Sequence, residues 1–195
     1  DYQDHEAWTW EHMALTRARV ISSSPEFRAQ IESVIREVLT RPRDARLIAN
    51  DVAEMRRAIA QEKGEDDIWD LKYAAGGMVD IDFIAQYLQL VHAADKPDIL
   101  SVDTRQALDN AHRLGVLSLT DVEILRPAAR LYHDLTQILR LCVSDRFKPD
   151  TVGEDLLRVM ARAGDAPDFS ALEARVRDIQ TDVRGVFLRV MEGGA

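Results

Sequence analysis

The chain has 195 residues, of which 46% are hydrophobic and 30% are charged, and its formal net charge at pH 7 is −9. This composition excludes an intrinsically disordered chain, and the excess of acids disfavours nonspecific binding to nucleic acid. The single cysteine, Cys142, excludes an intrachain disulfide and indicates a reducing, cytoplasmic setting. No apolar run approaches the roughly 20 residues that span a bilayer, so we expect no membrane partner. Because the chain opens on Asp1 rather than methionine, we expect a piece of a longer protein.

Apolar residues recur at helical spacing along nearly the whole chain, which predicts an all-α protein. Nine glycines and six prolines are few for a protein of many short strands, and they favour long helices. In the first half we expect a helix over roughly 4–21 and a second helix marked by Phe27, Ile31 and Val38. A third helix is marked by Ile48, Val52 and Ile59, with Pro42 in its first turn. A short and possibly extended segment over 68–73 follows, and a fourth helix begins after Gly76 and Gly77.

The second half shows the same helical period. We expect a helix over 102–114 stopped by Gly115, a long helix opened by a capping box of Thr120 and Glu123, a short helix over 151–163 and a last helix capped by Ser170 and Glu173. Pro127 should kink the long helix or split off its first turn, and Cys142 on its apolar stripe should be inert core. The sequence thus predicts a helical bundle of about seven to eight helices without a substantial sheet, as a single domain over 1–195 with possible sub-units 1–95 and 96–195.

The stretch from Asp70 to Tyr87 is the most unusual, and it allows two interpretations. As a helix it places Asp80 on an apolar stripe, where a buried acid needs a partner. Gly76 and Gly77 would then expose backbone amides at a helix N-terminus, where an anion can bind, and Lys72 is close enough to help.

As a strand, residues 79–83 alternate, so that Asp80 and Asp82 would face the same way and could hold Mg²⁺. No other part of the chain supplies a sheet for such a strand, and the helix is favoured. A structural ion pair with an arginine is then the simpler role for Asp80. Asp82 is more simply a solvent-facing acid in the first turn of the helix.

Arg17 and Arg19 are the notable cations of the first expected helix. Arg17 follows Trp10 by seven residues and shares its face, so it is either a partner for Asp80 or a phosphate ligand. Arg19 lies off that face, where a solvated charge is the simplest interpretation.

Other common chemistries find no support in the sequence. The five histidines show no metal-ligand spacing with acids or Cys142, and no nucleophile, Walker or dinucleotide-binding motif is present. The run Ser22-Ser23-Ser24 before Pro25 suits a helix cap. We therefore expect neither a catalytic residue nor a metal site in this chain.

Three separated blocks of the sequence occur in one order: Thr9 to Arg19, Arg41 to Asp44 with Asp51 to Arg56, and Asp70 to Lys72 with Gly76 to Tyr87. Together they resemble the C-terminal half of the glutamine synthetase adenylyltransferase family. The resemblance is strongest over roughly residues 8–90, and a similar helical region occurs in the related uridylyltransferase of the PII signal protein.

The resemblance implies a helical part of a bifunctional enzyme with two nucleotidyltransferase domains. The C-terminal unit of that family uses Mg²⁺ and ATP to transfer AMP to a tyrosine of glutamine synthetase, and the N-terminal unit removes the AMP. The PII protein and glutamine set the balance. The family's catalytic motif lies upstream and is not found in this chain, so we expect the chain alone to be inactive and to bind neither cofactor by itself.

Within this family two roles are open for the chain. It either packs on the upstream nucleotidyltransferase domain and helps to close the nucleotide or protein-substrate cleft, with Arg17, Arg19, Lys72, Gly76 and Gly77 near phosphate, or it docks glutamine synthetase or PII without touching nucleotide. In the first case Arg17, Lys72 and Asp80 should line a cleft. In the second they should be paired internally, with an exposed apolar patch elsewhere.

Overall fold

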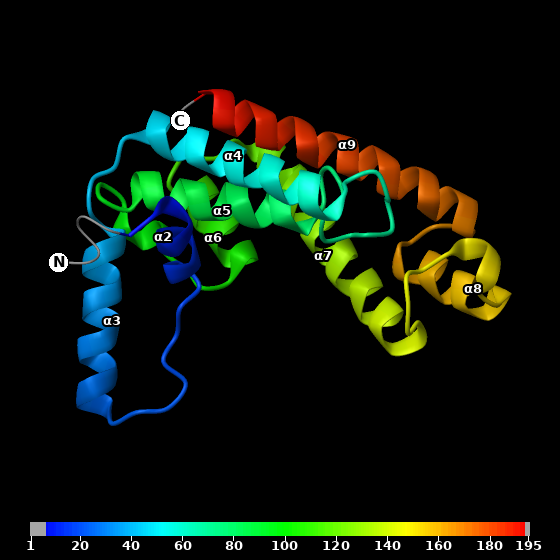
Figure 1. The fold of residues 1–195 in the computed structure, drawn as a ribbon, viewed down its shortest axis with the longest axis horizontal. Coiled ribbons are helices and arrows are strands. Elements are labelled where there is room, and N and C mark those ends of the chain that lie inside the picture. Colours follow the sequence, from blue (N-terminus) through cyan, green and yellow to red (C-terminus); the bar gives the residue numbers. More distant parts are fainter. Residues whose placement is uncertain (1–6, 194–195) are drawn as a thin grey trace.

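The computed structural model describes residues 7–193, and the fold of this part is built from helices without any β-strand (Figure 1). The all-α bundle predicted from the sequence, with seven to eight helices, is confirmed. The elements are α2 (Thr9–Leu15), α3 (Pro25–Leu39), α4 (Ala45–Lys63), α5 (Met78–His92), the 3-10 helix η1 (Pro97–Ile99), α6 (Thr104–Arg113), α7 (Leu119–Cys142), the 3-10 helix η2 (Pro149–Thr151), α8 (Glu154–Ala163) and α9 (Phe169–Gly193).

Helix α5 is the centre of the bundle. It packs against α4, α6, α7 and α9, and its side chains are buried on nearly every face, including Ile84, Tyr87 and Leu90. Figure 1 shows α4 and α9 running along one side of α5, with α8 closing the far end of α9. A helix that is apolar around its whole circumference has to be covered on all sides, which explains this central position. None of the helices in residues 7–193 is both long and apolar enough to span a membrane.

The first helix is shorter than the sequence predicted. Helix α2 ends at Leu15, and the Thr16 hydroxyl donates to the carbonyl of Met13 at 2.7 Å, where the chain leaves the helix. Met13 is buried, but Trp10 and Ile21, predicted on the same face, are exposed. The predicted helix over 4–21 is therefore wrong at its C-terminal end. Its expected first residues, 4–6, lie outside the described residues.

Short polar side chains set the helix starts, although not always those that the sequence indicated. Asp44 caps α4 by accepting the Leu47 amide at 2.9 Å, so Pro42 precedes that helix instead of lying in its first turn. Ser24 caps α3 as expected, and its hydroxyl accepts the Phe27 amide at 3.3 Å. Each cap satisfies a backbone donor that has no partner inside the helix.

The caps of the two long helices are also displaced from their predicted positions. Ser118, and not Thr120, caps α7, accepting the Asp121 amide at 3.1 Å. Asp168, and not Ser170, accepts the Ala171 amide at 2.8 Å at the start of α9. Each true cap lies two residues earlier than predicted, because a serine or an aspartate upstream also suits a cap and the capping-box pattern does not choose between them.

Three further expectations of the sequence can be compared with the structure in detail. Residues 68–73 form turns rather than an extended segment, and Trp69 packs there with ring centroids 5.2 Å from Phe147 and 5.1 Å from Phe169. Helix α7 continues through Pro127 without splitting. Cys142, the last residue of α7, is exposed instead of buried in the core, because the apolar stripe of α7 is no longer covered where the helix ends.

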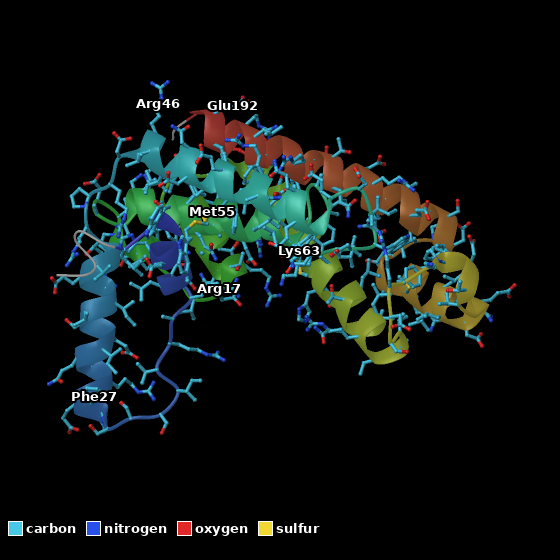
Figure 2. All side chains as sticks on the ribbon, viewed as in Figure 1. Arg17, Phe27, Arg46, Met55, Lys63 and Glu192 are labelled. Carbon is cyan, nitrogen blue, oxygen red and sulfur yellow. The ribbon has the colours of Figure 1, made fainter. Side chains whose placement is uncertain are left out.

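Helix α3 stands apart from the rest of the bundle. Only Val38 and Leu39, at its C-terminal end, are buried. Figure 1 shows α3 projecting away from the other helices, and Figure 2 places Phe27 near its far end. The helix that the sequence predicted is present, but nothing in the described chain covers most of its apolar face.

Candidate functional site

A buried carboxylate at the start of α5 joins three parts of the bundle. Asp80 is fully buried, and Arg56 on α4 donates its Nε–H to Oδ1 at 2.5 Å. Arg184 on α9 lies 3.3 Å from both carboxylate oxygens, and the Gly76 amide donates to Oδ2 at 2.6 Å. Asp80 therefore fastens α4, α9 and the loop before α5 to one point.

The partners of Asp80 agree with its structural interpretation as an ion pair, but they are not the arginine that the sequence offered. The sequence suggested Arg17, but Arg56 and Arg184 occupy this place. Arg56 follows Val52 by four residues on the apolar face of α4, and this spacing is the signal that could have identified it. Because residues 78–92 form a helix, the strand that would have presented Asp80 and Asp82 together to Mg²⁺ is wrong.

The guanidinium of Arg56 is nearly as buried as the carboxylate. Its Nη2 donates to the carbonyls of Tyr73 and Ala74 at 3.1 and 3.2 Å and lies 3.2 Å from a carboxylate oxygen of Glu65. Two charges buried together are tolerated when each is paired and hydrogen-bonded in this way. Its Nη1 is buried and has no hydrogen-bond partner among the described residues. The ion pair thus stabilises the fold, and both of its side chains are shielded from solvent.

The two glycines before α5 have their amides engaged within the chain. The Gly76 amide binds Asp80, and the Gly77 amide donates to the Ala74 carbonyl at 2.8 Å. The Gly76 carbonyl accepts from the Tyr132 hydroxyl at 2.9 Å. Burial, and then the negative charge of Asp80, raises the pKa of Tyr132 well above its ordinary value, so the hydroxyl remains a donor. This geometry argues against the predicted anion site at these two glycines.

Arg17 forms a second, partly exposed cluster with Asp82 and Thr104. Its Nη1 donates to Asp82 Oδ1 at 2.8 Å and to Thr104 Oγ1 at 2.9 Å, and the threonine hydroxyl donates to Asp82 at 2.6 Å. These bonds tie the end of α2 to α5 and α6. Arg17 therefore pairs with Asp82 rather than with Asp80, and Asp82 is an ion-pair partner rather than a simple solvent-facing acid.

The remaining candidate cations lie on the surface. Arg19 is exposed, and the exposed Lys72 lies with its Nζ 4.6 Å from the ring centroid of Tyr73. Arg17 lines a small cavity of about 260 Å³ together with Arg105 and His133, and Lys72 is not among the residues of that cavity. The predicted phosphate-binding residues therefore do not converge on one site.

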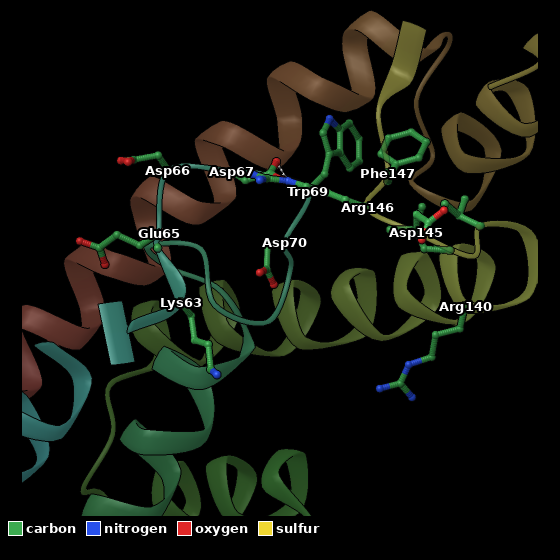
Figure 3. A pocket seen from close by; sticks show the side chains of 13 residues that line it. Lys63, Glu65, Asp66, Asp67, Trp69, Asp70, Arg140, Asp145, Arg146 and Phe147 are labelled. Carbon is green, nitrogen blue, oxygen red and sulfur yellow. Dashed lines mark hydrogen bonds and ion pairs between the residues drawn. The ribbon is translucent and has the colours of Figure 1, made fainter. Parts of the chain in front are cut away.

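A larger cavity of about 570 Å³ lies between the loop after α4 and the end of α7 (Figure 3). Trp69 and Phe147 form its apolar part, and an ion pair joins Arg146 Nε to Asp67 Oδ2 at 2.7 Å. The sequence did not single out this place. The charged residues that line the cavity are of both signs, so they identify no ligand class. They are Lys63, Glu65, Asp66, Asp67, Asp70, Arg140, Asp145 and Arg146.

The acidic side chains of the described residues do not gather into a metal site. Residues 7–193 contain no group of three or more histidine, cysteine or acidic side chains arranged to hold a metal ion. The buried Arg56 is paired with Asp80, and the Gly76 amide donates to the same carboxylate. These groups therefore fix helices to one another.

Comparisons with known proteins agree with the resemblance inferred from the sequence. The sequence model of glutamate-ammonia ligase adenylyltransferase (GlnE) matches residues 1–34, and that of GlnD PII-uridylyltransferase matches residues 46–191. A relative from Rhodopseudomonas palustris (strain BisB5) is 77% identical over 193 residues, covering 99% of this chain and 20% of the relative. A relative from Bradyrhizobium diazoefficiens (strain USDA 110) is 76% identical, covering 99% of this chain and 19% of the relative.

A more distant relative, from Xanthobacter autotrophicus (strain Py2), is 50% identical over 194 residues, covering 100% of this chain and 20% of the relative. All three relatives are named bifunctional glutamine synthetase adenylyltransferase/adenylyl-removing enzyme. The chain spans about a fifth of their length. Since the uridylyltransferase model covers more than half of the chain, the chain belongs to the GlnD PII-uridylyltransferase family, and its sequence corresponds to a segment of the bifunctional glutamine synthetase adenylyltransferase/adenylyl-removing enzymes.

Proposed function

We propose that this chain is a helical region of a cytoplasmic enzyme that transfers AMP from ATP to a tyrosine of glutamine synthetase and also removes it. Mg²⁺ and ATP bind in a nucleotidyltransferase domain elsewhere in the polypeptide, and PII acts on the whole enzyme. The names and identities of the relatives support this assignment. The helical region supplies a rigid body on which other parts of the enzyme and its protein substrate are positioned.

The sequence left two roles open, nucleotide binding and protein docking, and the internal pairing of the charged residues is the observation on which we choose between them. A role in nucleotide binding required Arg17, Lys72 and Asp80 to line one cleft. Instead, Asp80 is buried with Arg56, and Arg17 is bonded to Asp82. This pattern supports a positioning and docking role that does not involve direct contact with the phosphates.

Steady-state kinetics of AMP transfer by the full-length enzyme tests this role. We expect Arg17→Ala and Lys72→Ala to leave the KM for ATP within about twofold of the parent value, because neither cation contacts the nucleotide. Lys72→Ala serves as the control for loss of a surface charge outside the Arg17 cluster. A rise of about tenfold or more in the KM for ATP with Arg17→Ala alone would contradict the docking role. It would support nucleotide binding at the small cavity beside Arg17.

A further inference from the structure

The chain carries an unpartnered apolar face on its N-terminal arm, which we define as the loop over 16–24 together with α3. Phe27 and Val34 on α3 are 57% and 59% exposed, and Ile21 in the loop is 84% exposed. Phe27, Ile31, Val34 and Val38 fall on one side of the helix by their spacing. A 15-residue helix is marginal in water unless this side is packed, so the arm requires a cover.

The arm is held firmly at its base, so its apolar face has a defined direction. The Arg43 guanidinium donates to the carbonyls of Val38 and Leu39 at 2.8 and 3.0 Å and closes the C-terminal end of α3. Burial, and then the neighbouring Arg41, lowers the pKa of Arg43. Near the far end, Arg28 donates to a loop carbonyl, that of Val20, at 3.0 Å and ties the loop to the helix.

Two exposed tryptophans lie at the start of α2, Trp8 as its N-cap residue and Trp10 within the helix. Trp8 is 71% exposed and Trp10 is 55% exposed, and α2 contacts α3. Five of the eleven exposed large apolar side chains in residues 7–193 fall within residues 8–34. Aromatic residues are enriched in protein interfaces, and tryptophan is one of the residues that contribute most to binding, so this concentration indicates a docking surface. The five residues, which we call the arm face, are Trp8, Trp10, Ile21, Phe27 and Val34.

The two family models divide the chain between the arm and the packed bundle. The model that covers the packed bundle begins at residue 46, whereas residues 1–34, which contain the arm face, match the adenylyltransferase model. The chain also spans only about a fifth of its relatives' length. The arm face thus lies in the part of the chain that matches the adenylyltransferase model, and most of the relatives' length lies outside this chain.

We propose that the arm face docks on the part of the same polypeptide that completes this adenylyltransferase unit. This inference rests on the proposed function, since it takes the chain to be a region of the larger enzyme. The docked arm joins the bundle to that unit: the Arg17 cluster fastens α2 to α5 and α6, and α3 reaches across to the neighbouring part.

Hydrogen exchange at α3 in two proteins, the 195-residue chain and the full-length enzyme, tests the docking. We expect the α3 amides to exchange at least about tenfold more slowly in the full-length enzyme, because the covered helix no longer opens locally, while α8 exchanges equally in both. The double variant Phe27→Ser with Val34→Ser should abolish this difference and lower AMP transfer about tenfold. The matched control, Leu141→Ser with Val159→Ser, removes two exposed apolar side chains from α7 and α8 and should change neither.

The outcomes separate the docking from the proposed function. Equal α3 exchange in the two proteins overturns the docking, while AMP transfer by the same full-length enzyme still supports the proposed function. Slower α3 exchange in an enzyme that adds no AMP to glutamine synthetase supports the docking and overturns the proposed function. If α3 in the isolated chain becomes protected to the same degree as its concentration rises, the cover is a second copy and the proposal is wrong.

Discussion

Replacing Asp80 with asparagine is expected to lower the free energy of unfolding of the chain by about 3–5 kcal/mol, the usual cost of breaking a buried ion pair from one side. Asparagine keeps the shape of the side chain and removes its charge. Arg56 would then be a buried cation without its acid at 2.5 Å, and Arg184 would lose the same partner. The loss therefore comes from buried positive charge that only the partly exposed Glu65 still balances, rather than from a cavity.

Urea unfolding followed by circular dichroism measures this loss, and Asp82→Asn provides the matched control. Asp82 also lies in the first turns of α5 and also pairs with an arginine, but both side chains of that pair are partly exposed. A partly exposed pair contributes at most about 1 kcal/mol. If the two variants were destabilised equally, burial would not be what makes Asp80 important, and the account of the three-way junction would be wrong.

Replacing Gly76 with alanine is expected to cost more than about 4 kcal/mol or to prevent folding, which places it among the most damaging single substitutions. The residue has a φ of +75°, in the left-handed region that favours glycine. A Cβ added there would lie 1.8 Å from the backbone carbonyl oxygen of Gln180 on α9. Backbone cannot move aside as a flexible side chain can, so α9 would have to shift away from the loop that holds Asp80.

Gly64→Ala separates the two causes of this effect. Gly64 has a similar φ of +80°, but a Cβ there would meet nothing within 4 Å. Its substitution should cost only about 1–3 kcal/mol, the strain of placing a side chain in a backbone conformation (φ +80°, ψ 164°) that glycine alone adopts readily. Thermal unfolding of both variants gives the comparison. A loss at Gly76 no larger than that at Gly64 would contradict the close approach of α9.

Much of the architecture could be predicted from the sequence, because apolar periodicity directly reports which face of a helix is buried. The buried position of Asp80 followed from its place on such a stripe. Its partners could not be predicted, since Arg56 and Arg184 lie 24 and 104 residues away in the sequence. The spacing of residues along one helix does not show which arginine of another helix will contact it. For the same reason the sequence offered Arg17 as a partner for Asp80 or as a phosphate ligand, and did not identify Asp82 as its partner.

The boundaries and the surroundings of the helices were harder to predict for a different reason. A capping pattern is local and can be satisfied by neighbouring residues, as Ser118 and Thr120 show. The periodicity of α3 correctly predicted a helix with an apolar face, but periodicity does not tell whether the cover of that face lies within the same chain. Phe27 and Val34 are therefore exposed although the pattern marked them as buried.

The measurement that most directly tests the central claim is the intact mass of glutamine synthetase after incubation with Mg²⁺ and ATP. One sample contains the 195-residue chain alone and the other the full-length enzyme, and a parallel pair starts from adenylylated glutamine synthetase. We predict that only the full-length enzyme adds or removes the mass of an AMP group, because in the proposed function the chain positions the reaction and the catalytic acids lie elsewhere in the polypeptide. Addition or removal of AMP by the chain alone would contradict this account and would make Asp80 and Asp82 the first residues to replace.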